Sequence, residues 1–223
     1  MISELFETAV TGDQFLTAMQ DTLIMVALSL GFGSLLGLPL GIVLVICRPG
    51  GIQPNRLVHQ LLNPIVNIIR SLPFIILLIT ILPLTRLLVN TTIGTAGAIV
   101  PLVIFIAPYI SRLVENALLE VDEGILESAN AMGATTLQTI WYFMIPEAAS
   151  SLVLALTTAT IGLLGATAMA GTVGGGGIGD LAITYGYQRF DAFATISTAL
   201  VLIVIVQLLQ TLGTRLSRRI RRE

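Results

Sequence analysis

The chain has 223 residues, of which 55% are hydrophobic and only 11% are charged, and its formal net charge is −2. A soluble domain of this length needs about 25% charged residues to cover its surface. The composition and a mean hydropathy of +0.93 therefore exclude an ordinary soluble protein and favour a membrane protein. The slightly negative charge gives no basis for a nucleic-acid partner, and Cys47, the single cysteine, excludes an intramolecular disulfide.

Five long stretches of the sequence are apolar and nearly free of charge. Each is long enough for the roughly 20 residues that an α-helix needs to cross the hydrocarbon core of a membrane. The stretches are continuously apolar instead of alternating, which argues against β-barrel strands, and helices pair their own backbone groups in lipid. We therefore expect an all-α polytopic membrane protein, with one transmembrane domain over residues 1–223. Its five transmembrane helices are expected over residues 19–47, 58–83, 92–113, 148–170 and 192–214.

The arginines predict the orientation, because cytoplasmic loops of membrane proteins are enriched in basic residues. The loop after the first expected span holds Arg48 and Arg56, and the first 20 residues of the chain hold no basic residue. We therefore expect the N-terminus in the periplasm and the C-terminus in the cytoplasm. This orientation places residues 115–147 in the cytoplasm and residues 171–191 in the periplasm. The C-terminal tail, predicted to be cytoplasmic, holds Arg215, Arg218, Arg219, Arg221 and Arg222.

The cytoplasmic segment 115–147 has the pattern of two short helices joined at a glycine. Asp122 is placed to cap the first helix, and Gly133 can adopt the left-handed conformation that ends it. Thr135 and Gln138 have the spacing of a capping box that begins a second helix, which we expect to end at Pro146. An apolar stripe on that helix needs a covering surface, either membrane or a partner groove. The stripe is expected at Leu137, Ile140, Trp141 and Met144.

The same segment resembles the EAA loop of ABC importer permeases, whose pattern is EAA, three residues, Gly, nine residues and I-x-L-P. Ser128 replaces the first alanine of the pattern, Phe143 its isoleucine and Ile145 its leucine. The resemblance implies a coupling-helix pair that docks in a cleft of a cytoplasmic ATPase. The alternative is a plain interfacial loop with two surface helices. The implied coupling residues are Glu127, Ala129, Gly133, Ile145 and Pro146.

The periplasmic segment 171–191 is rich in glycine, which makes a regular helix unfavourable there. Irregular backbone at membrane depth is tolerated only inside protein or beside a water-filled cavity, so a pore mouth or outer gate fits the segment. The alternative is a flexible exterior turn. No Gly-Lys-Ser/Thr sequence follows, so the glycines do not form a nucleotide-binding P-loop. The candidate gate residues are Gly174, Gly175, Gly176 and Gly177.

Arg70 interrupts an apolar stretch and is the other candidate for the translocation path. A charge inside the membrane is costly and usually faces a cavity or a partner. Arg70 could attract the carboxylate of an amino-acid substrate, steady a dimer, or reach a membrane surface with its long side chain. Pro73, with Pro64 and Pro83 nearby, predicts kinks that could open a passage, and ordinary helix bending is the alternative.

The segment from Arg70 to Leu78 and the glycine-rich segment resemble the methionine-permease branch of the same family. The resemblance implies the ABC-type transmembrane domain of a bacterial inner-membrane importer, which moves a small amino acid by alternating access. Methionine is the best-matched substrate, with D- and L-forms both as candidates. The implied partners are a second copy of the chain, a cytoplasmic ATPase dimer that binds ATP and Mg, a periplasmic or lipid-anchored substrate-binding protein, and membrane lipid.

The sequence shows no nucleophile–base pair, carboxylate dyad or metal-ligand cluster, so we expect no catalytic residue, no metal site and no cofactor in this chain. Two other classes of function stay open. One is an ion-coupled secondary carrier or channel that acts without an ATPase, although such carriers usually hold intramembrane acids or an inverted repeat. The other is a membrane scaffold without a transport role.

Overall fold

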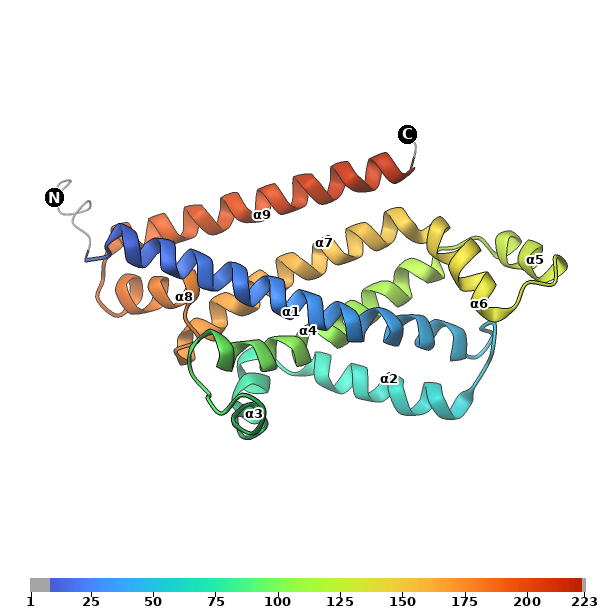
Figure 1. The fold of residues 1–223 in the computed structure, drawn as a ribbon, viewed down its shortest axis with the longest axis horizontal. Coiled ribbons are helices and arrows are strands. Elements are labelled where there is room, and N and C mark those ends of the chain that lie inside the picture. Colours follow the sequence, from blue (N-terminus) through green and yellow to red (C-terminus); the bar gives the residue numbers. More distant parts are fainter. Residues whose placement is uncertain (1–8, 222–223) are drawn as a thin grey trace. The chain divides into compact units, whose positions relative to one another are not determined.

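The computed structural model describes residues 9–221, which form helices and contain no strand. The chain divides into two compact units. Unit 1 holds the residues up to Phe32, Leu72–Ile106 and Thr160–Leu209. Unit 2 holds Gly33–Ser71, Ala107–Ala159 and the residues from Gln210 onward. Four long helices contribute a segment to each unit (Figure 1). These helices are α1 (Gly12–Cys47), α4 (Gly94–Leu119), α7 (Ile145–Ala170) and α9 (Ala192–Arg221).

The segment expected as one helix, 58–83, is two helices, α2 (Arg56–Ser71) and α3 (Phe74–Val89). Pro73, which lies between them, has φ −55° and ψ 135°, an extended conformation. A proline disfavours the helical conformation of the preceding residue, here Leu72, so the first helix ends before it. Pro64 and Pro83 lie inside α2 and α3, so proline at these two positions does not end a helix.

Among the described residues, four helices are long and apolar enough to cross a membrane: α1, α4, α9 and the continuous helical stretch Thr136–Val173. A fifth crossing results if α2 and α3 together form one broken span. Large apolar side chains on these helices are exposed, such as Leu35 (69%) and Leu212 (62%). Such a surface suits lipid rather than water.

Several helices extend beyond the expected ends, α1, α4 and α9 among them. Helix α1 begins at Gly12 because Thr11 and Gln14 form a reciprocal capping box: the Thr11 N–H donates to Gln14 Oε1 at 3.0 Å, and the Gln14 N–H donates to Thr11 Oγ1 at 3.3 Å. Helix α4 continues to Leu119 and α9 continues to Arg221. The arginines of the tail therefore lie on a helix, except Arg222, which is outside the described residues.

In unit 2, α1 packs closely against α4 through two small residues. A Cβ added to Gly37 would lie 2.6 Å from the carbonyl oxygen of Ala107, and one added to Gly41 would lie 2.6 Å from that of Ser111. These distances leave no room for a side chain, so both glycines let the two backbones approach. Leu44, Ile110 and Val114 fill the core of this unit beside the contact.

In unit 1, the glycine-rich segment expected to be irregular is irregular only in part: residues 174–176 are not helical, whereas the residues on either side form short helical turns. The helical parts are the 3₁₀ turn η3 (Gly171–Val173), the short helix α8 (Gly177–Leu181) and the π-helical turn η4 (Ala182–Tyr187). The glycines permit close backbone contacts: a Cβ added to Gly179 would overlap the backbone of Ala168. Packing between backbones thus replaces the side-chain contacts that an ordinary helix would make.

Candidate functional site

Unit 2 contains the helix pair formed by α5 (Glu123–Ala131), α6 (Thr136–Gln138) and the π-helical turn η2 (Thr139–Met144). Figure 1 shows α5 and α6 at the end of this unit where the loop from α1 to α2 lies. Asp122 caps α5 as expected, because its Oδ1 accepts a hydrogen bond from the Gly124 N–H at 2.8 Å.

The turn between the two helices is fixed by backbone hydrogen bonds around Gly133. Gly133 has φ +74°, its N–H donates to the Asn130 carbonyl at 2.9 Å, and the Ala134 N–H donates to the Ala129 carbonyl at 3.0 Å. This arrangement is a Schellman motif, which requires a left-handed residue at the glycine. The capping box of Thr135 and Gln138 follows at once, with the Thr135 N–H donating to Gln138 Oε1 at 2.8 Å. Both sequence-based predictions are confirmed.

The second helix of the pair does not end at Pro146, contrary to expectation. Pro146 lies in the first turn of α7, and the helical stretch is continuous from Thr136 to Val173. The π turn accommodates the proline, which has no N–H to donate and whose ring crowds the carbonyl four residues earlier. In the wider turn the Ile145 N–H donates to the carbonyl of Ile140, five residues back.

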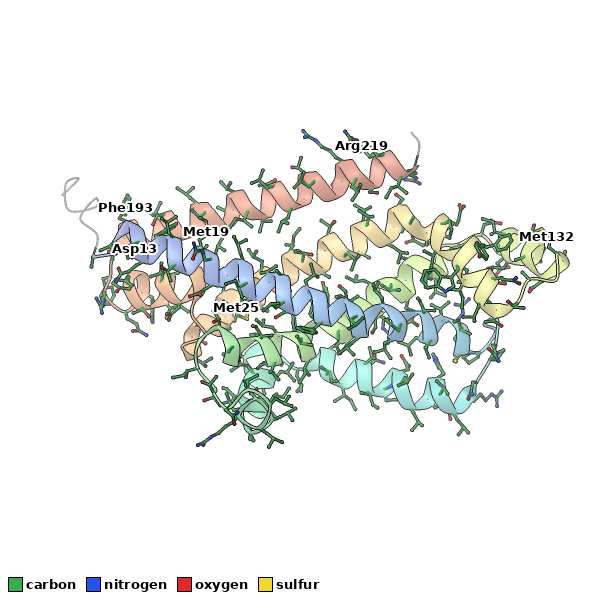
Figure 2. The ribbon with its side chains drawn as sticks, in the orientation of Figure 1. Asp13, Met19, Met25, Met132, Phe193 and Arg219 are labelled. Carbon is green, nitrogen blue, oxygen red and sulfur yellow. The ribbon has the colours of Figure 1, made fainter. Side chains whose placement is uncertain are left out.

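The expected single apolar stripe divides between two faces. Ile140 and Met144 are buried, whereas Leu137 and Trp141 are 68% and 62% exposed. Tyr142 is exposed beside them, as is Met132 at the end of α5 (Figure 2). The first pair of side chains therefore anchors the helix within unit 2, and the second presents an apolar surface that a partner or a membrane can cover.

The implied coupling residues occupy different environments within unit 2. Glu127 is exposed on α5, Gly133 forms the turn, and Ile145 and Pro146 begin α7. Ala129 is completely buried, so it packs inside the helix pair and cannot touch an ATPase directly. A cavity of about 270 Å³ separates α5 from the α1–α2 loop, and its lining includes Arg48, Gly50, Glu123, Glu127 and Asn130.

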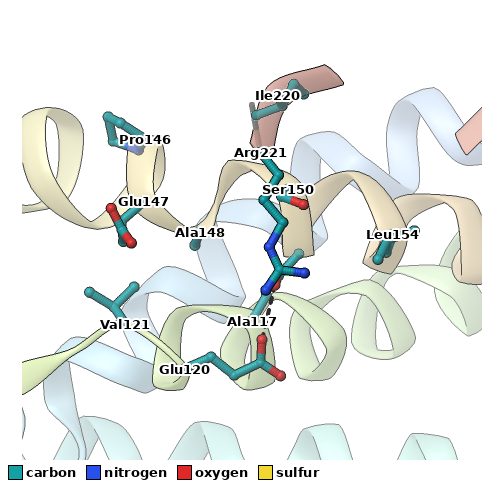
Figure 3. A pocket seen from close by; sticks show the side chains of 11 residues that line it. Ala117, Glu120, Val121, Pro146, Glu147, Ala148, Ser150, Leu154, Ile220 and Arg221 are labelled. Atoms are coloured by element: carbon teal, nitrogen blue, oxygen red, sulfur yellow. Dashed lines mark hydrogen bonds between the residues drawn. The ribbon is translucent and has the colours of Figure 1, made fainter. Parts of the chain in front are cut away.

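A second cavity of unit 2, about 420 Å³ in volume, lies where α4, α7 and α9 meet (Figure 3). Ser151 of α7 donates to Glu120, the residue after α4, at 2.9 Å, and the hydroxyls of Ser150 and Ser217 are 2.7 Å apart. Figure 3 shows the side chain of Arg221 pointing toward Glu120. The Ser150–Ser217 contact joins α9 to α7, and the Ser151–Glu120 contact joins α7 to the end of α4.

In unit 1, the glycine-rich segment is attached to α1. The N–H of Ile178 donates to Thr22 Oγ1 at 2.8 Å, and a Cβ added to Gly177 would lie 2.6 Å from that oxygen and 2.8 Å from Met25 Cε. The Gly174 carbonyl accepts from the Gly94 N–H at 2.8 Å. Thr22 could not be recognised from the sequence, because it lies 156 residues from its partner.

Arg70 and Pro73 occupy different units. Arg70 is exposed on α2 in unit 2, with its guanidinium carbon 6.0 Å from the centre of the Tyr109 ring. Pro73, like Gly174, Gly175, Gly176 and Gly177, belongs to unit 1. Their placement in the translocation path stays a prediction. Within the described residues, no group of three or more His, Cys, Asp or Glu side chains is placed to hold a metal ion.

A polar cluster that the sequence did not reveal joins α2 to α4 in unit 2. Arg112 forms an ion pair with Glu115 at 2.7 Å and donates to the Oδ1 atoms of Asn63 and Asn67, each at 2.7 Å. Arg112 lies within α4, seven residues before its end. The side chain of Glu115 is only 8% exposed, so the ion pair is largely withdrawn from solvent.

Residues 19–222 match the family model of the binding-protein-dependent transport system inner membrane component. The chain belongs to this family of permeases. The permease is 45% identical over 212 residues to the probable D-methionine transport system permease protein MetI of Vibrio cholerae, an alignment that covers 95% of this chain and 94% of that relative. It is 48% identical to the D-methionine transport system permease protein MetI of Escherichia coli K12, covering 68% and 70% of the two chains.

The permease also resembles a solved structure of the MetNI methionine ABC transporter in an inward-facing conformation. The TM-score is 0.92 at 41% identity, and the match covers 95% of this chain and 99% of that chain. A solved amino acid ABC transporter with histidines shares the fold, with a TM-score of 0.75 at 20% identity. The permease is therefore a multi-pass protein of the inner membrane.

Proposed function

We propose that the chain is the membrane-spanning subunit of an ATP-driven importer that moves methionine across the bacterial inner membrane. The observation that carries this function is the match to a methionine ABC transporter along nearly the whole chain, at a TM-score of 0.92. The relatives named as D-methionine permeases support the same substrate. Both stereoisomers are candidate substrates. The chain itself catalyses no reaction, because a separate ATPase hydrolyses ATP.

The working assembly contains two copies of this chain, two cytoplasmic ATPase subunits that bind ATP and Mg, and a substrate-binding protein outside the membrane. The family description, a component of binding-protein-dependent transport systems, supports the last partner. We place the N-terminus in the periplasm and the C-terminus in the cytoplasm, since the arginine-bearing end of α9 and the Arg48 loop then both face the cytoplasm.

The helix pair is the element best suited to receive the ATPase. Its turn is fixed by the Schellman motif at Gly133 and by the capping box at Thr135, so it offers a rigid surface rather than a mobile loop. Trp141 is exposed on it, and aromatic side chains supply much of the binding energy at protein interfaces. Closure of the ATPase dimer moves this surface, and the spans alternate between inward-open and outward-open states.

The proposed function is tested by methionine uptake in cells that lack their own methionine importers. Cells that express this permease with its ATPase and binding protein should accumulate labelled L-methionine, and unlabelled D-methionine should compete if both forms are carried. ATP depletion should stop uptake, whereas an uncoupler that removes ion gradients but spares ATP should not. Uptake that follows the ion gradient would instead support a secondary carrier, and no methionine uptake would contradict the substrate.

Replacing Glu127 with alanine should weaken the association with the ATPase by about tenfold, the cost of losing one charge-assisted contact at an interface. Glu127 is exposed and borders the cavity beside α5, where a basic side chain of the partner can reach it. The measurement is the amount of ATPase that co-purifies with the permease. Glu123→Ala is the matched control, since Glu123 lies one turn earlier on α5 and borders the same cavity. If both variants retained the same amount of ATPase, Glu127 would not contribute to the docking site.

A further inference from the structure

Helix α2 presents two different exposed surfaces. Polar residues recur every three or four positions along one edge, which places them on one face of the helix. Large apolar residues form a separate exposed face of the same helix, with Leu57, Leu61, Ile65 and Ile68 between 52% and 74% exposed. The polar edge consists of Arg56, Gln60, Asn63, Asn67 and Arg70, of which Asn63 is half-buried and the others are exposed.

These two surfaces require different surroundings. The apolar face suits lipid. A polar edge at membrane depth must face either protein or a water-filled cavity, because lipid offers it no hydrogen-bond partner. Helices α2 and α3 are apolar enough to enter a membrane only as a pair, either as one broken span or as a re-entrant loop. We take α2 to lie at membrane depth. Asn63 and Asn67 contact Arg112, and Arg70 lies near the Tyr109 ring. The other polar atoms of the edge need either a further protein surface or a water-filled path, which a transport protein provides.

Arg112 fixes the orientation of two side chains on this edge. It donates to Oδ1 of Asn63 and of Asn67, so both carboxamide oxygens are occupied by a cation. The amide nitrogens, which can only donate, are the remaining polar atoms of the two side chains. Glu115 pairs with Arg112 at 2.7 Å and balances its charge. The ion pair therefore holds the two asparagines with their donor atoms directed away from it.

Arg70 extends the same row of donors. Asn63, Asn67 and Arg70 lie at positions i, i+4 and i+7 on one face of α2, and we call these three residues the donor edge. Helix α2 contains no aspartate or glutamate, so no acid of this helix competes for these donors. Amide N–H groups and a guanidinium in a row fit an anion with several acceptor atoms, and a carboxylate has two such oxygens.

We propose that the donor edge binds the carboxylate of the transported amino acid as it passes along the translocation path. Arg112 and Glu115 act as positioning residues that orient the asparagines. This inference rests on the proposed function, because it takes an amino acid as the solute. It does not depend on the side chain of that amino acid, since every α-amino acid carries the same carboxylate.

Asn67→Asp separates this role from a purely structural one. The aspartate keeps the size of asparagine and still offers oxygen to Arg112, so the link between α2 and α4 is retained or strengthened. The substitution also removes the donor and adds a negative charge that repels a carboxylate. We expect methionine uptake in cells to fall by at least about tenfold, while the assembled complex keeps its yield and melting temperature. Ile68→Ala, on the apolar face of the same helix, is the control and should stay within about twofold of the parent.

A thiol introduced by Asn67→Cys, in a Cys47→Ser background, tests the same placement without relying on transport. A charged, water-soluble thiol reagent needs the thiolate, which forms in water and not in lipid. The reagent should modify Asn67→Cys but not Ile68→Cys. Millimolar L-methionine should slow the reaction at least about threefold, because bound methionine shields the thiol from the reagent. Methioninamide, which lacks the carboxylate, should not slow it.

Three results would contradict the proposal that the donor edge binds the carboxylate. They are unchanged uptake by Asn67→Asp, equal losses of uptake and of assembled complex in that variant, and no reaction of the thiol in Asn67→Cys. The assignment of methionine as the substrate is tested by a different result. If the parent imports a different amino acid and no methionine, the proposed substrate is wrong. The donor edge still stands in that case if Asn67→Asp lowers import of that amino acid.

Discussion

Replacing Gly177 with alanine should destabilise the permease by roughly 2 to 5 kcal/mol. Gly177 has φ +82°, a conformation in which a side chain is strained, and the added Cβ would collide with Thr22 Oγ1 and Met25 Cε. Moving Thr22 away would also leave the buried N–H of Ile178 without its acceptor. The expected result is a lower melting temperature of the purified complex and loss of methionine uptake.

Gly174→Ala is the matched control for this substitution. Gly174 has a similar positive φ, +75°, but a Cβ there would meet nothing within 4 Å. It should cost only the conformational penalty of about 1 to 2 kcal/mol. The difference between the two variants therefore measures the contact with α1. Equal melting temperatures would show that this contact contributes nothing to stability.

Replacing Ala129 with leucine should release the ATPase from the complex. Ala129 is completely buried in the helix pair, and its carbonyl accepts the Ala134 N–H of the Schellman motif. A larger side chain forces α5 outward at a cost of about 1 to 3 kcal/mol, which displaces the turn at Gly133 and alters the docking surface. We expect roughly tenfold less ATPase to co-purify, with the permease still inserted in the membrane.

Ala131→Leu is the control, because it makes the same chemical change at the exposed end of the same helix. Substitutions at exposed positions usually change stability by no more than about 0.5 kcal/mol, so this variant should retain the ATPase. Two results would contradict the internal packing role of Ala129. One is retention of ATPase by Ala129→Leu, and the other is equal loss in both variants.

The helix pair was predicted in detail because its signals are local. Asp122, Gly133 and the capping box at Thr135 each act on backbone groups within a few residues, so spacing alone identifies them. The π turn before Pro146 was not foreseen. A proline indicates that the hydrogen bonding of a helix is disturbed. Whether the helix ends, as at Pro73, or continues through a wider π turn, as at Pro146, depends on the packing of the surrounding helices.

The long-range contacts could not be predicted from one sequence. Arg112 lies 49 residues from Asn63 and 45 from Asn67, and no spacing rule connects them. The glycine-rich segment was expected to be irregular because intrinsic propensity disfavours glycine in helices. Residues 174–176 are indeed not helical, but close backbone packing in unit 1 permits the short helix α8 directly after them, which composition did not predict.

The uninterrupted helix from Thr136 to Val173 determines what kind of motion can reach the membrane from the helix pair. None of the residues with positive φ falls within this range, and the π turn keeps the backbone hydrogen-bonded ahead of Pro146. A displacement of the helix pair is therefore passed into α7 along a continuous hydrogen-bonded backbone and not across a loop that could absorb it.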